Sequence, residues 1–176
     1  MNKDLIKQDI YDWVVNYIEA NHAFYDYKFP PCPFAKAARL KGMLDIQVCE
    51  QGSYYNFAEK YVTSMSTDTN FTVRILVYPH SLKYRFWMKK QIAKLNTKIV
   101  GMDLYAQIGS AIKTKSKYPG LLETGPYGIV IINRLSDILS GHQSLLKTDY
   151  YKSWSDQHYH AVVTRRQGIV DKCTKT

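Results

Sequence analysis

The loop Phe29-Pro30-Pro31-Cys32-Pro33-Phe34 presents the most chemically capable side chain of this sequence, the Cys32 thiol. Each proline fixes its own φ and favours an extended conformation in the residue before it, so we expect a stiff loop. If Pro33 is the first helical residue, Cys32 is the N-cap, where free N–H groups and the helix dipole lower a thiol pKa. The pattern predicts a reactive or metal-binding Cys32. The alternative is a small buried side chain packed with Phe29 and Phe34.

Three histidines are candidate partners for this thiol. A catalytic cysteine needs a base, and His80 is the candidate because it directly follows the predicted central strand 71–78. His158 and His160 are two residues apart in a predicted strand over 158–166, which would place both on one face. One thiolate and two imidazoles with an open position could bind Zn or Fe as a catalytic centre. The alternative is two half-exposed histidines on an edge strand.

Positive charge is concentrated in the middle of the chain. The net charge is +9, and residues 79–118 contain nine basic side chains but a single acidic one. The predicted helix 82–95 and its start contain five candidate anion-binding residues: Lys83, Arg85, Lys89, Lys90 and Lys94. Aromatic residues between these cations suit a nucleic-acid backbone with stacked bases, or an acidic protein partner. The alternative is a solvated helix face whose lysines keep the protein soluble.

Alternating helices and strands must position these residues. Apolar spacing predicts helices over 4–21, 54–65 and 82–95 and a further helix from Ser136. Alternating or continuous apolar runs predict strands over 44–49, 71–78, 99–105, 129–132 and 158–166. No glycine-rich phosphate loop joins them. The pattern predicts an α+β two-layer sandwich, with a mixed sheet of four or five strands and helices mainly on one face.

Length and composition favour one cytoplasmic domain. With 176 residues we expect a single globular domain over 1–168, followed by a flexible tail over 169–176. Three cysteines without zinc-site spacing favour a reduced cytosolic protein. No stretch approaches the roughly 18 apolar residues of a membrane helix, so we expect no membrane partner. The 15 tyrosines favour half-buried faces and make a homo-oligomer a candidate assembly.

Part of the sequence resembles a known family. Cys32-Pro33-Phe34-Ala35-Lys36-Ala37, followed by Lys41-Gly42, resembles the Leu-Cys-Pro-Phe-Ala box of an uncharacterised bacterial family, domain of unknown function 1415. Leu76-Val77-Tyr78-Pro79 is similar to its apolar strand ending at a proline, and residues 125–134 resemble its Ser-Pro-Tyr-Pro strand ending in arginine. The resemblance spans roughly residues 10–140. We expect Tyr127 and Arg134, within the last run, to bind a substrate.

Two histidine positions of that family differ in this chain. Met102 and Asp103 lie where the family has a His-Pro pair, and Ile131 lies where it has a histidine. If those histidines join the cysteine in the family's site, either His80, His158 and His160 replace them or the site is degenerate. The family has no established activity to carry over.

Two functions of different classes follow from the sequence. The first is a small cytosolic enzyme that uses Cys32, alone or with a histidine-held metal, on an unidentified small molecule. The second is a binding protein without catalytic activity, which docks its basic, tyrosine-rich face on nucleic acid or an acidic partner.

Overall fold

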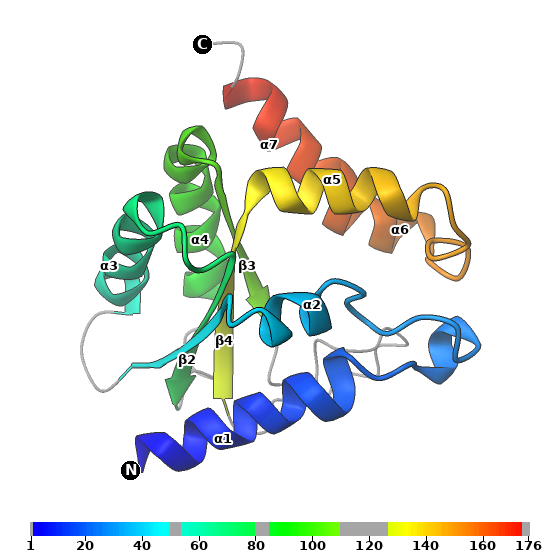
Figure 1. Cartoon of the computed structure of the whole chain (residues 1–176). Helices are drawn as coiled ribbons and strands as arrows, with labels where there is room; N and C mark the ends of the chain where they lie inside the picture. The colour runs from blue at the N-terminus through cyan, green and yellow to red at the C-terminus, as the bar shows by residue number, and fades with distance from the viewer. Residues whose placement is uncertain (1, 50–53, 80–84, 110–126, 174–176) are drawn as a thin grey trace.

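The computed structural model describes residues 2–49, 54–79, 85–109 and 127–173, and Figure 1 shows their arrangement around one sheet. With π- and 3₁₀-helical turns marked η, the elements in these ranges are α1 (Lys3–Trp13), η1 (Val14–Ile18), η2 (Ala23–Tyr25), α2 (Ala35–Leu40), β1 (Leu44–Val48), α3 (Tyr54–Thr67), β2 (Val73–Pro79), α4 (Arg85–Ile99), η4 (Val100–Met102), β3 (Leu104–Gly109), β4 (Tyr127–Arg134), α5 (Leu135–Leu145), α6 (Asp156–Tyr159), η5 (His160–Thr164) and α7 (Arg165–Cys173).

A mixed sheet forms the centre of the molecule. Its four strands lie in the order β1-β2-β4-β3. β1 is parallel to β2, whereas β4 runs antiparallel to both β2 and β3. The predicted α+β fold with a mixed sheet is confirmed, and it has four strands in the part of the chain that the structure describes.

Helices cover both faces of this sheet. Leu76 and Tyr78 of β2 pack on one face with buried residues of α3 and α4. Ile75 and Val77, which alternate with them, pack on the other face with α1. A strand buried on both faces is expected to be apolar throughout, which explains the continuous run in β2. The two longest helices, α3 and α4, lie on one face of the sheet. The other face is covered by α1, which adds a third layer to the two that were predicted.

The N-terminal helix is formed and placed by its own sequence. Ile6, Ile10 and Trp13 are buried at three- and four-residue spacing, so they form one apolar stripe against the sheet. The Asn2 side chain caps the helix by accepting a hydrogen bond from the Asp4 backbone N–H at 3.0 Å. The predicted helix over 4–21 is α-helical to Trp13 and continues as the π-helical turn η1.

Three predictions for secondary structure are wrong. The strand expected over 158–166 is helical, because Val163 and Val170 are buried two helical turns apart and this packing overrides the strand preference of β-branched residues. The strand expected over 99–105 begins at Leu104, since Ile99 ends α4. The tail expected from 169 is helical to Cys173, because Val170 packs with Val100 and Leu135.

Two segments far apart in sequence, 24–29 and 150–154, meet in an aromatic cluster, defined here as Phe24, Tyr25, Phe29, Tyr150, Tyr151 and Trp154. The Tyr25 and Tyr150 rings are stacked, with their centroids 4.7 Å apart. The Trp154 Nε1–H donates a hydrogen bond to the Tyr25 hydroxyl at 3.1 Å. The Tyr150 hydroxyl donates to the Pro31 carbonyl, so this cluster anchors the loop that precedes Cys32.

Candidate functional site

Cys32 is held in place but not activated. Its backbone N–H donates to the Ile18 carbonyl at 3.1 Å, and its carbonyl accepts from the Ala35 N–H at 3.3 Å. The helix begins two residues later than predicted, because Phe34 rather than Cys32 is the N-cap of α2. Burial raises the pKa of the Cys32 thiol, although the backbone N–H groups of Phe34 and Ala35 act in the opposite direction. The predicted lowering of this pKa is therefore wrong.

The predicted metal centre does not form. Residues two apart on a helix point about 200° apart around its axis, so His158 and His160 do not share a face. The His158 ring packs on Trp154 with centroids 4.3 Å apart, and His160 is exposed. Within the described ranges, no group of three or more His, Cys, Asp or Glu side chains could bind a metal ion. His80, the predicted catalytic base, lies outside the described residues.

Tyr127 and Arg134 both have structural partners. The Tyr127 hydroxyl donates to Asp9 Oδ2 at 2.8 Å and so joins β4 to α1. Arg134 Nη2 donates to the carbonyls of Met65 and Asp68, at 2.7 and 2.8 Å, at the end of α3. The two residues lie at opposite ends of an eight-residue strand, about 24 Å apart, which is too far for one small molecule to contact both.

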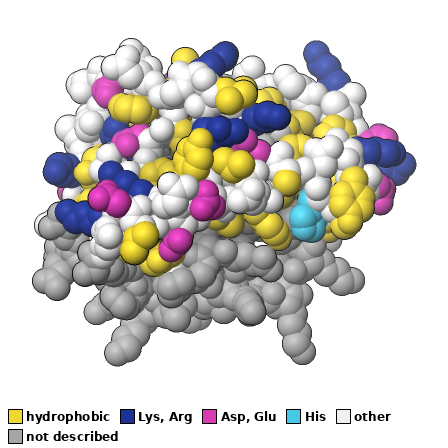
Figure 2. Space-filling view, turned by 60° about the horizontal axis from the view of Figure 1, so that its bottom comes forward, with side chains coloured by type: hydrophobic (Ala, Val, Ile, Leu, Met, Phe, Trp, Pro, Cys, Tyr) yellow, Lys and Arg dark blue, Asp and Glu magenta, His cyan; other side chains and the backbone are white. Residues whose placement is uncertain are grey.

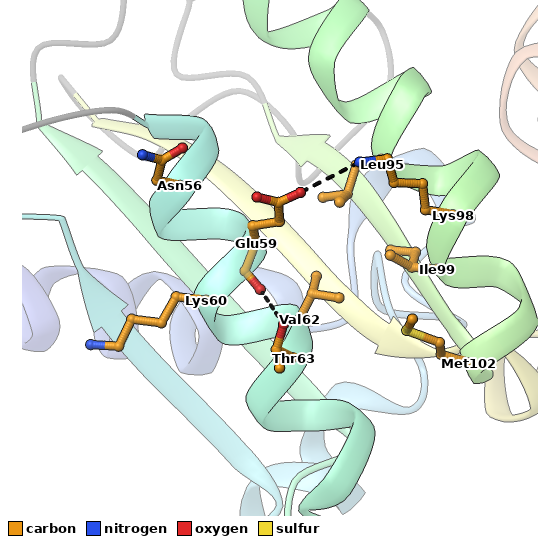
Figure 3. Close-up of a pocket in the computed structure, with 9 residues that line it drawn as sticks. All are labelled: Asn56, Glu59, Lys60, Val62, Thr63, Leu95, Lys98, Ile99 and Met102. Atoms are coloured by element: carbon orange, nitrogen blue, oxygen red, sulfur yellow. Dashed lines mark hydrogen bonds and ion pairs between the residues drawn. The ribbon is translucent and has the colours of Figure 1, made fainter.

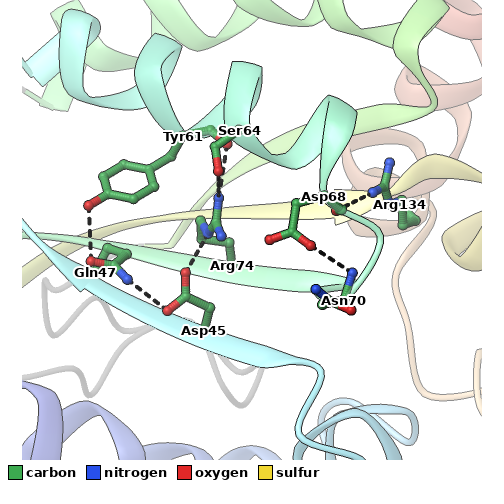
Figure 4. A network of polar contacts seen from close by, with 8 residues as sticks. All are labelled: Asp45, Gln47, Tyr61, Ser64, Asp68, Asn70, Arg74 and Arg134. Carbon is green, nitrogen blue, oxygen red and sulfur yellow. Dashed lines mark hydrogen bonds and ion pairs between the residues drawn. The ribbon is translucent and has the colours of Figure 1, made fainter.

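Arg74 is a buried arginine with hydrogen-bond, ion-pair and aromatic partners (Figure 4). Its Nε donates to Asp45 Oδ2 at 2.5 Å, and its Nη1 donates to the Tyr61 carbonyl and to the Ser64 hydroxyl. The Tyr61 and Phe71 rings cover the guanidinium at 5.1 and 5.2 Å. This network of a carboxylate, a carbonyl, a hydroxyl and two rings joins α3 to β1 and β2, which gives Arg74 a structural role.

A shallow pocket of about 370 Å³ lies between α3 and α4 (Figure 3). Its polar lining includes Asn56, Glu59 and Lys60 from α3 and Lys98 from α4, above the apolar Leu95. Glu59 and Lys98 form an exposed ion pair across it at 3.5 Å. A pocket with mixed charge and no activated side chain favours contact with a partner rather than catalysis.

The predicted anion-binding residues that the structure describes are exposed on α4. Lys89, Lys90 and Lys94 all face solvent, while Met88 and Leu95 of the same helix are buried in the core. The helix has no acidic residue, and these three lysines form no ion pair with a described residue. Lys83 and the side chain of Arg85 lie outside the described part.

The opposite face of the molecule has a different charge pattern. Figure 2 brings the α1 side forward, where Lys and Arg side chains lie among Asp and Glu side chains. In α1 itself two lysines alternate with three aspartates, which fits an ordinary solvated helix. The helix α4 has no acidic residue of its own, so its charge pattern differs from that of α1.

Sequence reasoning missed Arg166, at the start of α7. Its side chain is buried, with 5% exposure, and its Nε–H has no hydrogen-bond partner. The tyrosines around it belong to β3, the turn after α5, and α6, and of these only Tyr159 of α6 lies within ten residues of Arg166 in sequence. Val163, Arg166 and Val170 are buried at three- and four-residue spacing, which is typical of one helix face. This spacing could have identified both the helix and Arg166, but the charge at the middle position obscured it.

Comparisons with known proteins leave the family open. No helix among the described residues is long and apolar enough to cross a membrane. The resemblance to domain of unknown function 1415 stays a prediction, because no family model, no curated protein and no solved structure matches the chain.

Proposed function

We propose that this protein binds nucleic acid through the exposed lysine face of α4, defined as Lys89, Lys90, Lys94 and Lys98. The single observation that supports the proposal is the charge composition of this helix, which has five basic and no acidic residues over Arg85–Ile99 and in which only Lys98, paired with Glu59 of α3, has a described acidic partner. Neutralising phosphates with lysines releases counterions, which supplies most of the affinity of sequence-independent nucleic-acid binding.

The spacing of the lysines supports a linear anionic partner. Lys90, Lys94 and Lys98 recur every four residues, so they form one row on the helix with about 6 Å between successive positions along the axis. Like charges at this spacing repel and destabilise a helix by a few tenths of a kcal/mol per pair. A row of phosphates along the helix removes that cost, whereas a solvated helix gains nothing from it.

The pocket between α3 and α4 extends this surface. Lys98 belongs both to the lysine row and to the pocket lining, which also includes Lys60 of α3, although the Lys60 amino group points away from α4 (Figure 3). Lys98 Nζ also lies 3.5 Å from the half-buried Tyr55 hydroxyl, so an aromatic ring borders the row. A polyanion that follows α4 therefore meets further cations and an aromatic edge at the end of the helix.

The enzyme alternative has less support. A thiol nucleophile needs a lowered pKa or an adjacent base, and burial raises the pKa of Cys32. The proposed binding function depends on no activated side chain.

Fluorescence anisotropy with labelled single-stranded and duplex oligonucleotides tests the proposal across a range of salt concentrations. We expect Lys89→Gln/Lys90→Gln/Lys94→Gln to weaken binding on the order of 100-fold at low salt and to flatten the slope of log K against log[salt] by about 2 to 3. The matched control is Lys28→Gln/Lys36→Gln/Lys41→Gln, which removes the same charge from exposed positions outside α4 and keeps the wild-type slope.

Two outcomes would contradict the proposal. Equal losses in both triple variants would mean that net charge, rather than the α4 face, sets the affinity. Competition by poly-glutamate with the same salt slope as the oligonucleotides would instead identify an acidic protein surface as the partner.

A further inference from the structure

Arg166 lacks the partners that a buried cation requires. Its guanidinium lies at the start of α7 with 5% of the residue exposed, and Nε has no hydrogen-bond partner. Among the described residues no carboxylate forms an ion pair with it. Burying an unpaired charge costs several kcal/mol. We therefore expect the buried Arg166 guanidinium to have a function that offsets this cost.

Phenol groups and one histidine surround this charge. Arg166 interacts electrostatically with Tyr105, Tyr151 and Tyr159, and its charge also acts on His142. The Tyr151 and Tyr159 rings meet edge to face at 5.3 Å, and the His142 ring lies 5.4 Å from Tyr151. These residues come from β3, α5, α6 and the turn between the two helices, so distant segments converge on the guanidinium.

The Arg166 guanidinium is surrounded by phenol groups, which can donate hydrogen bonds. Guanidinium N–H groups and phenolic O–H groups donate, and none of them carries a negative charge at neutral pH. His142 Nδ1 lies 2.9 Å from the Tyr151 hydroxyl, which orients that ring. Because burial and the Arg166 charge lower the pKa of His142, the imidazole is neutral at pH 7 and Arg166 supplies the positive charge.

We propose that Arg166, together with Tyr105, Tyr151 and Tyr159, binds a small oxyanion such as inorganic phosphate or a carboxylate. The arginine provides a planar fork of N–H donors that matches the geometry of either group. All three tyrosines are half-buried, so the groups around the guanidinium themselves reach the protein surface. The π-helical turn η5 ends at Thr164, two residues before Arg166, and π-helical turns occur frequently at functional sites.

This site is independent of the α4 lysine face. It involves a small ligand and a buried cation on α7, whereas the proposed nucleic-acid surface uses exposed lysines. Lys89→Gln/Lys90→Gln/Lys94→Gln therefore keeps the response to small oxyanions, and loss of Arg166 keeps the salt slope of oligonucleotide binding.

Thermal unfolding with inorganic phosphate, acetate or chloride at matched ionic strength tests the proposal. We expect phosphate or acetate, at about ten times its Kd, to raise the Tm of the wild type by about 4 °C relative to chloride. The anion that gives this shift identifies the ligand class. Arg166→Met loses the shift, whereas Arg165→Met, which removes the same charge from the exposed neighbouring position, keeps it.

A second measurement applies if Arg166→Met does not fold. The Nε–H resonance of Arg166 in ¹⁵N NMR spectra of the wild type must shift on addition of the same anion. An unchanged Tm with both oxyanions, equal shifts in Arg165→Met and Arg166→Met, or an unchanged Arg166 resonance would each overturn the proposal.

Discussion

Two buried arginines of this protein occupy opposite environments. Arg74 reaches Asp45, a carbonyl, a hydroxyl and two aromatic rings between the sheet and α3 (Figure 4). Arg166 is equally buried, but its Nε–H has no partner and its neighbours are phenols. The comparison shows that the chain can neutralise a buried guanidinium where its role is structural, so the open Arg166 is a candidate for binding.

The largest expected effect on stability comes from removing the carboxylate partner of Arg74. Asp45→Ala leaves the Arg74 charge buried without its carboxylate, so we expect the free energy of unfolding to fall by about 3 to 5 kcal/mol in urea titrations. Asp149→Ala, at an exposed position in the turn after α5, serves as the control and stays within about 0.5 kcal/mol of the wild type. A loss below about 1 kcal/mol in Asp45→Ala would mean that the Arg74 network contributes little.

Removing each arginine in turn tests the comparison directly. Arg74→Met leaves Asp45 without its cation, and we expect the free energy of unfolding to fall by about 3 kcal/mol. Arg166→Met removes a charge that has no carboxylate partner, so its free energy of unfolding in chloride buffer stays within about 1 kcal/mol of the wild type or rises. Equal losses in the two variants would show that Arg166 is a structural residue.

The smallest expected effect is on pH dependence. Burial, and then the Arg166 charge, lower the pKa of His142 from its ordinary value of 6.5, and burial also lowers that of His158. The unfolded chain therefore takes up protons first as the pH falls, so stability is present above pH 6.5 and decreases as the pH drops through and below that value. Urea titrations between pH 7.5 and 5 measure the decrease.

Arg166→Met sharpens this measurement. Without the neighbouring charge, the pKa of His142 moves back toward its ordinary value, and the loss of stability at low pH becomes smaller. NMR titration of the His142 ring reports the same change at the residue itself. An identical His142 titration in the wild type and in Arg166→Met would show that the two groups do not interact.

The sheet could be predicted from the sequence because its signals are local. The runs at 44–49, 71–78 and 129–132 bury alternating or continuous apolar side chains, and each forms a strand. The C-terminal helices could not be predicted in this way. Val162, Val163 and Thr164 individually favour a strand, and Arg166 places a charge at a core position of the helical repeat.

The candidate sites differ in the same way: one follows from a local pattern, and the other depends on contacts between distant segments. Exposure of Lys89, Lys90 and Lys94 follows from the spacing of apolar residues in one helix, so a local pattern was sufficient. The environment of Cys32 includes Tyr25 and Tyr150, which interact electrostatically with its thiol and are 125 residues apart in sequence, and no local pattern contains that information. The stiff loop expected from the prolines stays a prediction, whereas the raised pKa of the half-buried Cys32 thiol did not follow from them.

The hydrogen bond between Tyr150 and Pro31 joins groups 119 residues apart in sequence. During synthesis on the ribosome, the loop before Cys32 can acquire this partner only after Tyr150 has emerged from the exit tunnel. Closing so long a loop is entropically slow, so the early segment waits for the late one before its aromatic side chains are shielded. The segment that is made first therefore completes its contacts only after the segment that is made last.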